Sequence, residues 1–131
     1  ALECDFLIPA ALGSAINKNN VDTLNCKVVI EAANGPVTPI AAETLWKKHV
    51  PVIPDILTNA GGVTVSYFEW VQNLQQFKWE LEEVDTKLET KMVKAFNEVY
   101  NIKVEKNVPM RIASFMVAID RVSRSYTLRG V

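Results

Sequence analysis

Asn59-Ala-Gly-Gly-Val-Thr-Val-Ser-Tyr-Phe-Glu-Trp70 begins as a glycine turn and continues as a helix. Apolar side chains recur there every three or four residues and share one helical face: Val63, Tyr67, Trp70 and Leu74. The two glycines carry no Cβ, so another molecule can approach the backbone closely. The first amides of the helix lack intrahelical partners and lie at the positive end of its dipole. This terminus therefore suits a carboxylate or a phosphate.

Ser66 lies one turn inside this predicted helix. Helical side chains lean back toward the N-terminus, so its hydroxyl is expected to point at whatever the glycines admit. An alternative interpretation needs no ligand: a glycine turn starts the helix, and the serine bonds to its own backbone. The spacing alone does not separate the two interpretations.

The composition is that of an ordinary globular protein. The 131 residues are 49% apolar and 22% charged, with a net charge of −1, enough for one domain with a core. This balance gives no electrostatic reason to expect nucleic acid or an anionic membrane as a partner. No apolar run approaches the ~20 residues of a membrane span. Because the first buried run starts near the first residue, we expect a piece of a longer protein.

The two cysteines, Cys4 and Cys26, flank predicted buried strands. They are too few for a disulfide framework, and no Cys/His cluster indicates a metal. We interpret both as small buried hydrophobic residues in a reducing compartment. The predicted location is cytoplasmic, or an organelle matrix in a eukaryote.

Three apolar runs, at residues 6–8, 27–30 and 52–57, predict buried strands. The second is β-branched and continuous, as expected of a strand covered on both faces. Thr38 is the expected N-cap of a helix that starts at Pro39, runs to about residue 48 and turns Ala42, Leu45 and Trp46 to the core. Residues 12–24 show a weaker helical pattern. Strands that alternate with helices predict a parallel sheet.

Small or amide side chains follow each predicted strand: Ala10 and Ala11, then Asn34, then Asn59. Parallel sheets bind ligands outside the carboxyl ends of their strands. A carboxamide both donates and accepts hydrogen bonds. The sequence therefore predicts one crevice there, although asparagines that merely form turns would give the same pattern.

The C-terminal half, from about residue 75, predicts two long helices. Acidic residues 80–85 open the first, and Glu83 and Lys87 form a favourable i,i+4 pair. Pro109 suits the first position of the second helix. Its apolar stripe is predicted to comprise Ile112, Phe115, Ile119, Val122 and Tyr126.

Three segments carry a family resemblance: 4–12 (CDFLIPAAL), 31–36 (EAANGP) and above all 54–70 (PDILTNAGGVTVSYFEW). On these segments, and on the Leu-Arg-Gly near its end, the chain resembles the C-terminal part of a glutamate dehydrogenase, in the Glu/Leu/Phe/Val dehydrogenase family. The resemblance covers essentially the whole chain, 1–131. It implies an α/β fold: the second half of a Rossmann-type parallel sheet, with three strands and covering helices, followed by long C-terminal helices.

The same resemblance implies an enzyme that oxidises L-glutamate to 2-oxoglutarate and ammonia, with hydride transfer to NAD or NADP. The catalytic lysine and aspartate of the family, and its Gly-x-Gly-x-x-Gly turn, belong to parts not present in this sequence. We therefore expect this chain alone to be inactive, with no catalytic residue and no metal site. The resemblance also implies a homo-oligomer, a hexamer.

By resemblance, Asn34 and Asn59 match asparagines that contact the nicotinamide ribose and carboxamide. Ala10 and Ala11 match a loop against the nicotinamide nucleotide. Val63 and Ser66 match the substrate side, where Ser66 helps to read the distal carboxylate of glutamate. That hydroxyl favours glutamate over branched-chain or aromatic amino acids. A dehydrogenase for such an amino acid, and a non-catalytic binding module, are the alternatives.

Overall fold

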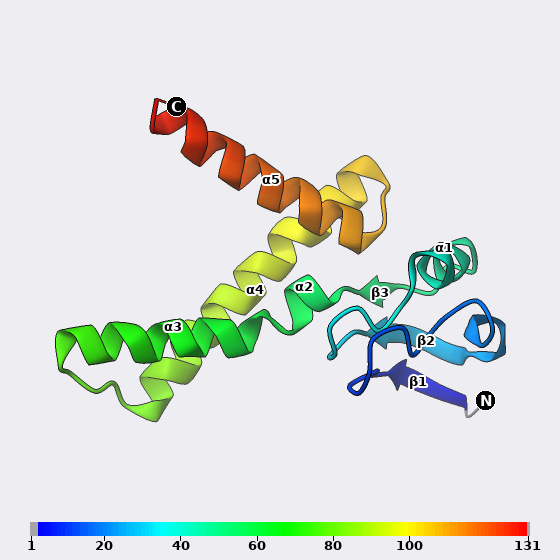
Figure 1. Cartoon of the computed structure of the whole chain (residues 1–131), viewed down its shortest axis with the longest axis horizontal. Helices are drawn as coiled ribbons and strands as arrows, with labels where there is room; N and C mark the ends of the chain where they lie inside the picture. Colours follow the sequence, from blue (N-terminus) through cyan, green and yellow to red (C-terminus); the bar gives the residue numbers. More distant parts are fainter. Residues whose placement is uncertain (1–2, 131) are drawn as a thin grey trace.

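Three parallel strands form the sheet in the computed structural model, which describes residues 3–130. They are β1 (Glu3–Leu7), β2 (Asn25–Ile30) and β3 (Val52–Ile53), in the order β1-β2-β3 (Figure 1). In the register of the sheet, Cys4 of β1 lies opposite Cys26 of β2, and Val29 of β2 lies opposite Val52 of β3. The predicted parallel sheet is thus confirmed.

Helix α1 (Pro39–Lys47) packs on this sheet and builds the first core. Thr38 is its N-cap and accepts a hydrogen bond from the Ala41 amide at 3.4 Å, as predicted. The buried residues of this core are Ile16, Val21, Val29, Val37, Ala41 and Leu45. The prediction for Trp46 was wrong, because it remains 37% exposed. The buried i,i+4 pair Ala41 and Leu45 sets the helix face, and the next residue turns about 100° away from it.

Residues 12–24 contain only a short 3₁₀ helix, η1 (Val21–Thr23), so the helical prediction there was wrong. Asparagine side chains explain the difference. Asn20 accepts from the Asn17 amide through Oδ1 and donates through Nδ2 to the Ala15 carbonyl. Such bonds to the local backbone compete with a helix.

The strand predicted at 52–57 is also shorter than expected, because Pro54 ends it. Helix α2 (Asp55–Thr58) follows at once, and the Pro54 carbonyl accepts from the Leu57 and Thr58 amides. Helix α3 (Ala60–Gln75) begins directly after Asn59. The predicted glycine loop was therefore wrong, since Gly61 and Gly62 form the first turn of α3. Glycine costs a helix free energy but does not forbid it.

Helices α3, α4 (Leu81–Lys106) and α5 (Met110–Leu128) extend away from the sheet (Figure 1). A second core joins α2, α4 and α5 to β3 and contains Leu57, Val99, Met110 and Ala113, with Ile53 of β3 packed against it. The predicted acidic start of α4 and its Glu83–Lys87 pair are present, with 3.4 Å between Nζ and Oε1. Pro109 lies one position earlier than predicted, as the N-cap of α5.

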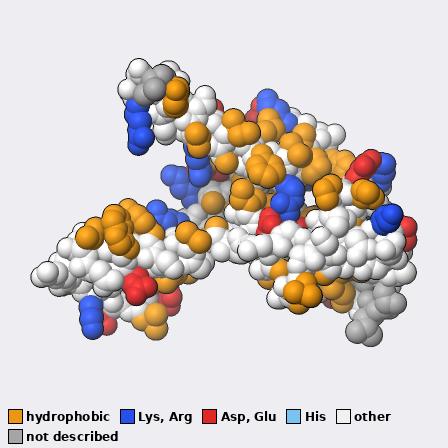
Figure 2. Space-filling model, viewed as in Figure 1, with side chains coloured by type: hydrophobic (Ala, Val, Ile, Leu, Met, Phe, Trp, Pro, Cys, Tyr) orange, Lys and Arg blue, Asp and Glu red, His pale blue; other side chains and the backbone are white. Residues whose placement is uncertain are grey.

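Large apolar surfaces remain uncovered on the helices and on the sheet (Figure 2). Phe6 of β1 is 63% exposed, so the prediction of a buried strand at residues 6–8 was wrong. Val28 of β2 is only half-buried, so the expectation that the strand at residues 27–30 is covered on both faces was also wrong. The predicted apolar stripe of α5 is exposed: Ile112, Phe115, Ile119, Val122 and Tyr126. Instead α5 buries Met110, Ala113 and Ser114. None of the helices between residues 3 and 130 is long and apolar enough to cross a membrane.

Candidate functional site

The carboxyl ends of the three strands meet through backbone hydrogen bonds. The Pro9 carbonyl, after β1, accepts from the Ala32 and Ala33 amides after β2, at 3.1 and 3.0 Å. This ties the exposed Ala10–Ala11 segment to the turn that carries Asn34. The structure therefore places two of the three predicted stretches side by side.

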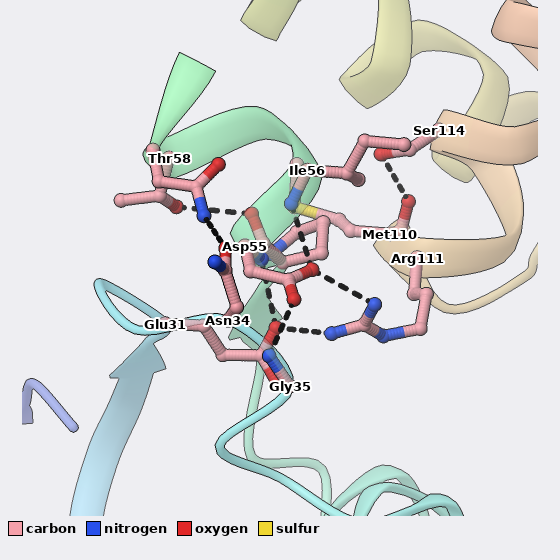
Figure 3. A network of polar contacts seen from close by, with 11 residues as sticks. Glu31, Asn34, Gly35, Asp55, Ile56, Thr58, Met110, Arg111 and Ser114 are labelled. Atoms are coloured by element: carbon pink, nitrogen blue, oxygen red, sulfur yellow. Dashed lines mark hydrogen bonds and ion pairs between the residues drawn. The ribbon is translucent and has the colours of Figure 1, made fainter. Parts of the chain in front are cut away.

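The third stretch joins through its asparagine side chain. Asn59 donates from Nδ2 to Oδ1 of Asn34 at 2.6 Å, although the two residues are 25 positions apart (Figure 3). Among residues 3–130, no other hydrogen bond involves Nδ2 of Asn34 or Oδ1 of Asn59. The pair thus presents one donor group and one acceptor at the surface. A primary carboxamide such as that of nicotinamide offers the matching acceptor and donor.

Glycines beside this pair leave open space. Gly35 has φ +57°, and a Cβ built on it or on Gly62 would meet no atom within 4 Å. Gly61 differs, because a Cβ there would face Leu88 and Met92 of α4 at 3.9 and 4.0 Å. A bound molecule can therefore approach the backbone at Gly35 and Gly62, while Gly61 faces the neighbouring helix.

The two predicted substrate-side residues lie on α3. Val63 is 76% exposed, and Ser66 is exposed as well. The Ser66 hydroxyl donates to the Gly62 carbonyl at 3.1 Å. This is the bond to its own helix backbone that the alternative interpretation, without a ligand, predicts. The structure does not bring this hydroxyl to the asparagine pair. Rotation about one bond redirects it, because a serine hydroxyl both donates and accepts.

Three charged residues that sequence reasoning did not select lie beside Asn34 (Figure 3). Glu31 follows β2, Asp55 opens α2, and Arg111 lies in the first turn of α5. Arg111 Nη1 donates to Asp55 Oδ1 at 2.9 Å, and Nη2 donates to Glu31 Oε2. The available signal was an acidic residue directly after a buried apolar strand, which needs a partner when it is buried.

The two carboxyl groups of this network are shifted in opposite directions. Burial raises the pKa of Glu31, and it outweighs the lowering effects of the Asp55 amide and the Arg111 guanidinium. Burial also tends to raise the pKa of Asp55. Hydrogen bonds from the Gly35 and Ile56 amides, together with Arg111, nevertheless bring that pKa below its ordinary value. Glu31 Oε1 is buried without a hydrogen-bond partner.

Metal ligation has no support in this part of the molecule. Within residues 3–130, no group of three or more His, Cys, Asp or Glu side chains lies close enough to hold a metal ion. Cys4 and Cys26 are free thiols and only half-buried. Burial and the neighbouring Cys4 raise the pKa of Cys26.

Comparison with known proteins decides the family. The sequence model of the Glutamate/Leucine/Phenylalanine/Valine dehydrogenase family matches residues 1–130. The chain belongs to this family. It is 52% identical over 130 residues to the glutamate dehydrogenase of Thermotoga maritima, and the match covers 99% of this chain but 31% of that protein.

Solved structures of the family share the fold. The glutamate dehydrogenase of Peptoniphilus asaccharolyticus matches with a TM-score of 0.89 and 45% identity, over 94% of this chain and 31% of that one. The hetero-hexameric glutamate dehydrogenase of Thermus thermophilus, in its Leu-bound form, matches with a TM-score of 0.92 and 31% identity, over 97% and 30%. The α/β fold with long C-terminal helices is therefore that of a Glu/Leu/Phe/Val dehydrogenase. This chain spans about a third of the length of these relatives.

Proposed function

We propose that this chain forms part of a glutamate dehydrogenase, which converts L-glutamate to 2-oxoglutarate and ammonia with NAD or NADP. The observation that carries the proposal is the Asn34–Asn59 pair, held at 2.6 Å at the strand ends of a dehydrogenase fold. Ligands of such sheets bind outside these ends. Family membership and the 52% identity to a glutamate dehydrogenase support the same assignment.

The strand-end residues fit a nicotinamide nucleotide. In this proposal Asn34 and Asn59 hydrogen-bond the nicotinamide carboxamide and ribose, and Ala10 and Ala11 lie against the same nucleotide. The open space over Gly35 and Gly62 supports close approach of a planar ring to the backbone. A nicotinamide nucleotide held by these residues would supply the hydride acceptor for oxidation at the α-carbon of the amino acid. These residues of the chain bind and orient; the family places the proton-transfer groups in another domain.

The proposed substrate contacts are Val63 and Ser66 on α3. Ser66 would exchange its bond to the Gly62 carbonyl for one to the distal carboxylate of glutamate. A site that hydrogen-bonds a polar substrate group discriminates strongly against analogues that lack it. Because this hydroxyl is bonded to its own helix in the structure, a dehydrogenase for an apolar amino acid is the second candidate.

A test uses the full-length protein that contains this chain. Turnover is measured with 2-oxoglutarate and ammonia, and with the 2-oxo acids of leucine, valine and phenylalanine, using each nicotinamide nucleotide. The proposal predicts turnover with 2-oxoglutarate, and a loss in Ser66→Ala of about tenfold or more in kcat/KM for this substrate. Ser125→Ala is the matched control, because that exposed serine also bonds to the carbonyl four residues earlier, on α5.

Each outcome has a consequence. Preference for an apolar 2-oxo acid, unchanged in Ser66→Ala, would establish the second candidate. A folded protein inert with every 2-oxo acid would indicate a non-catalytic binding module. The proposed assembly is a homo-hexamer, which analytical ultracentrifugation of the same full-length protein tests.

A further inference from the structure

The charged cluster of Glu31, Asp55 and Arg111 links three parts of the fold. Arg111 comes from α5, 56 positions after Asp55 and 80 after Glu31. Its side chain is 31% exposed, while those of Asp55 and Glu31 are 15% and 1% exposed. The guanidinium is therefore the most exposed member of the network, and it lies beside both carboxylates (Figure 3). One planar fork reaching two carboxylates is a geometry that arginine provides and lysine does not.

The carboxylates in turn hold the backbone beside Asn34. Asp55 Oδ2 accepts from the Gly35 amide at 2.7 Å. Gly35 directly follows Asn34 and has a left-handed φ of +57°, one of several conformations that are open to a residue without a Cβ, so the bond to Asp55 helps to select it. Loss of the Asp55 carboxylate from this position would therefore loosen the turn that carries Asn34.

The same carboxylates hold the helix that carries Asn59. The Asp55 amide donates to Glu31 Oε2 at 2.8 Å, and the Ile56 amide donates to Asp55 Oδ1 at 2.7 Å. These bonds fix the start of α2. The Asn59 amide donates to the Asp55 carbonyl at 2.9 Å, so the position of Asn59 follows that of Asp55. Asn34 is thus linked to Asp55 through the amide of the next residue, and Asn59 lies one helical turn after Asp55.

Stability alone does not account for this cluster. A partly buried ion pair loses much of its attraction to desolvation, and Glu31 Oε1 remains unpartnered. What the cluster does provide is a fixed distance between two chain segments. Without Arg111, two adjacent carboxylates would face each other with no cation between them, and they would move apart or take up a proton.

We propose that Arg111 is a positioning residue: by bridging Glu31 and Asp55 it holds Asn34 and Asn59 at the spacing that a nicotinamide nucleotide requires. The inference rests on the proposed function for its ligand. It assigns to the C-terminal helix α5 a role in cofactor binding, although Arg111 itself does not touch the cofactor.

The experiment compares Arg111→Met, Arg111→Lys and wild type in the full-length protein. Arg121→Met is the matched control, because Arg121 also lies on α5 and pairs with one carboxylate, Glu98. Steady-state kinetics give KM for the nicotinamide nucleotide and for 2-oxoglutarate, nucleotide binding is measured by fluorescence, and amide hydrogen exchange is followed at Gly35. The melting temperature reports the loss of stability in each variant.

In Arg111→Met we expect KM and Kd for the nucleotide to rise by about tenfold or more, a typical scale for a displaced binding group. KM for 2-oxoglutarate should change less than about twofold by the same reasoning. KM and Kd of Arg111→Lys for the nucleotide should lie between those of wild type and Arg111→Met. Arg121→Met should match wild type in nucleotide binding. Faster exchange at Gly35 in Arg111→Met alone would locate the effect in the turn.

Three results would overturn the inference: unchanged nucleotide binding in Arg111→Met, equal loss in Arg121→Met, or unchanged exchange at Gly35. A failure of the proposed function is seen separately, because wild type would then neither bind a nicotinamide nucleotide nor turn over. In that event the exchange rate at Gly35 still decides whether Arg111 positions the Asn34 turn.

Discussion

Two adjacent glycines in the first turn of α3 differ in what lies over them. A Cβ at Gly61 faces α4, and one at Gly62 faces open space. Alanine at either site should raise the free energy of unfolding by up to ~1 kcal/mol, because alanine favours a helix. Only Gly62→Ala should weaken ligand binding in the full-length dehydrogenase, measured as KM for 2-oxoglutarate and for the nucleotide. Gly61→Ala serves as the control, and equal effects of the two would contradict close approach at Gly62.

Glu31 and Asp55 predict opposite pH dependences. Because the folded pKa of Glu31 is raised, the stability it contributes is full below the ordinary glutamate pKa of 4.5 and is lost as pH rises through the folded value. The folded pKa of Asp55 is lowered, so its contribution is present above 3.8 and is lost as pH falls through the folded value.

Chemical denaturation of wild type, Glu31→Gln and Asp55→Asn between about pH 3 and pH 7 measures both contributions. Wild type should lose stability relative to Glu31→Gln as pH rises above 4.5. It should lose stability relative to Asp55→Asn as pH falls below 3.8. Slopes of the same sign for the two variants would contradict the assigned directions.

At the scale of the element, the stability of α1 depends on its N-cap, Thr38. Thr38→Ala removes the oxygen that accepts from the Ala41 amide, and loss of an N-cap costs roughly 0.5–2 kcal/mol. At 3.4 Å this bond is long, so we expect the lower part of that range. Thr44→Ala is the control: its hydroxyl bonds the Ile40 carbonyl inside the same helix. Equal destabilisation of the two variants in urea would argue against a capping role.

Two of the valines on helix α4 lie in contrasting surroundings. Val99 is 4% exposed in the second core, and Val104 is 58% exposed on the same helix. Val99→Ala should lower the free energy of unfolding by about 2 kcal/mol through lost burial and a cavity. Val104→Ala should stay within about 0.5 kcal/mol of wild type. Similar costs at both sites would mean that α4 does not dock through Val99.

At the scale of the whole molecule, the exposed apolar stripes predict self-association of the isolated chain. Val63, Trp70 and Leu74 on α3, and Ile119 and Val122 on α5, are all more than half exposed, and contiguous apolar patches mark interaction surfaces. Light scattering should show species larger than a monomer that grow with concentration. Ile119→Lys with Val122→Lys should reduce them. A monodisperse monomer at high concentration would contradict the prediction.

The same surfaces explain where sequence reasoning failed. Periodicity identified the stripe on α5 that includes Phe115, Ile119 and Val122, but not what covers it. Among the described residues α5 packs through Met110 and Ala113 instead. Periodicity gives a face, whereas packing depends on which neighbours the chain supplies.

The parallel sheet, the Thr38 cap, the long C-terminal helices and the family could all be predicted from the sequence, because periodicity, capping and a specific motif are local properties. The packing of the folded chain was needed to show that Gly61 and Gly62 are helical and that Trp46 stays exposed. It alone brought Arg111 to Glu31 and Asp55 beside Asn34 and Asn59. Residues 56 and 80 positions apart carry no shared local pattern, and their meeting follows from how α5 docks on the end of the sheet.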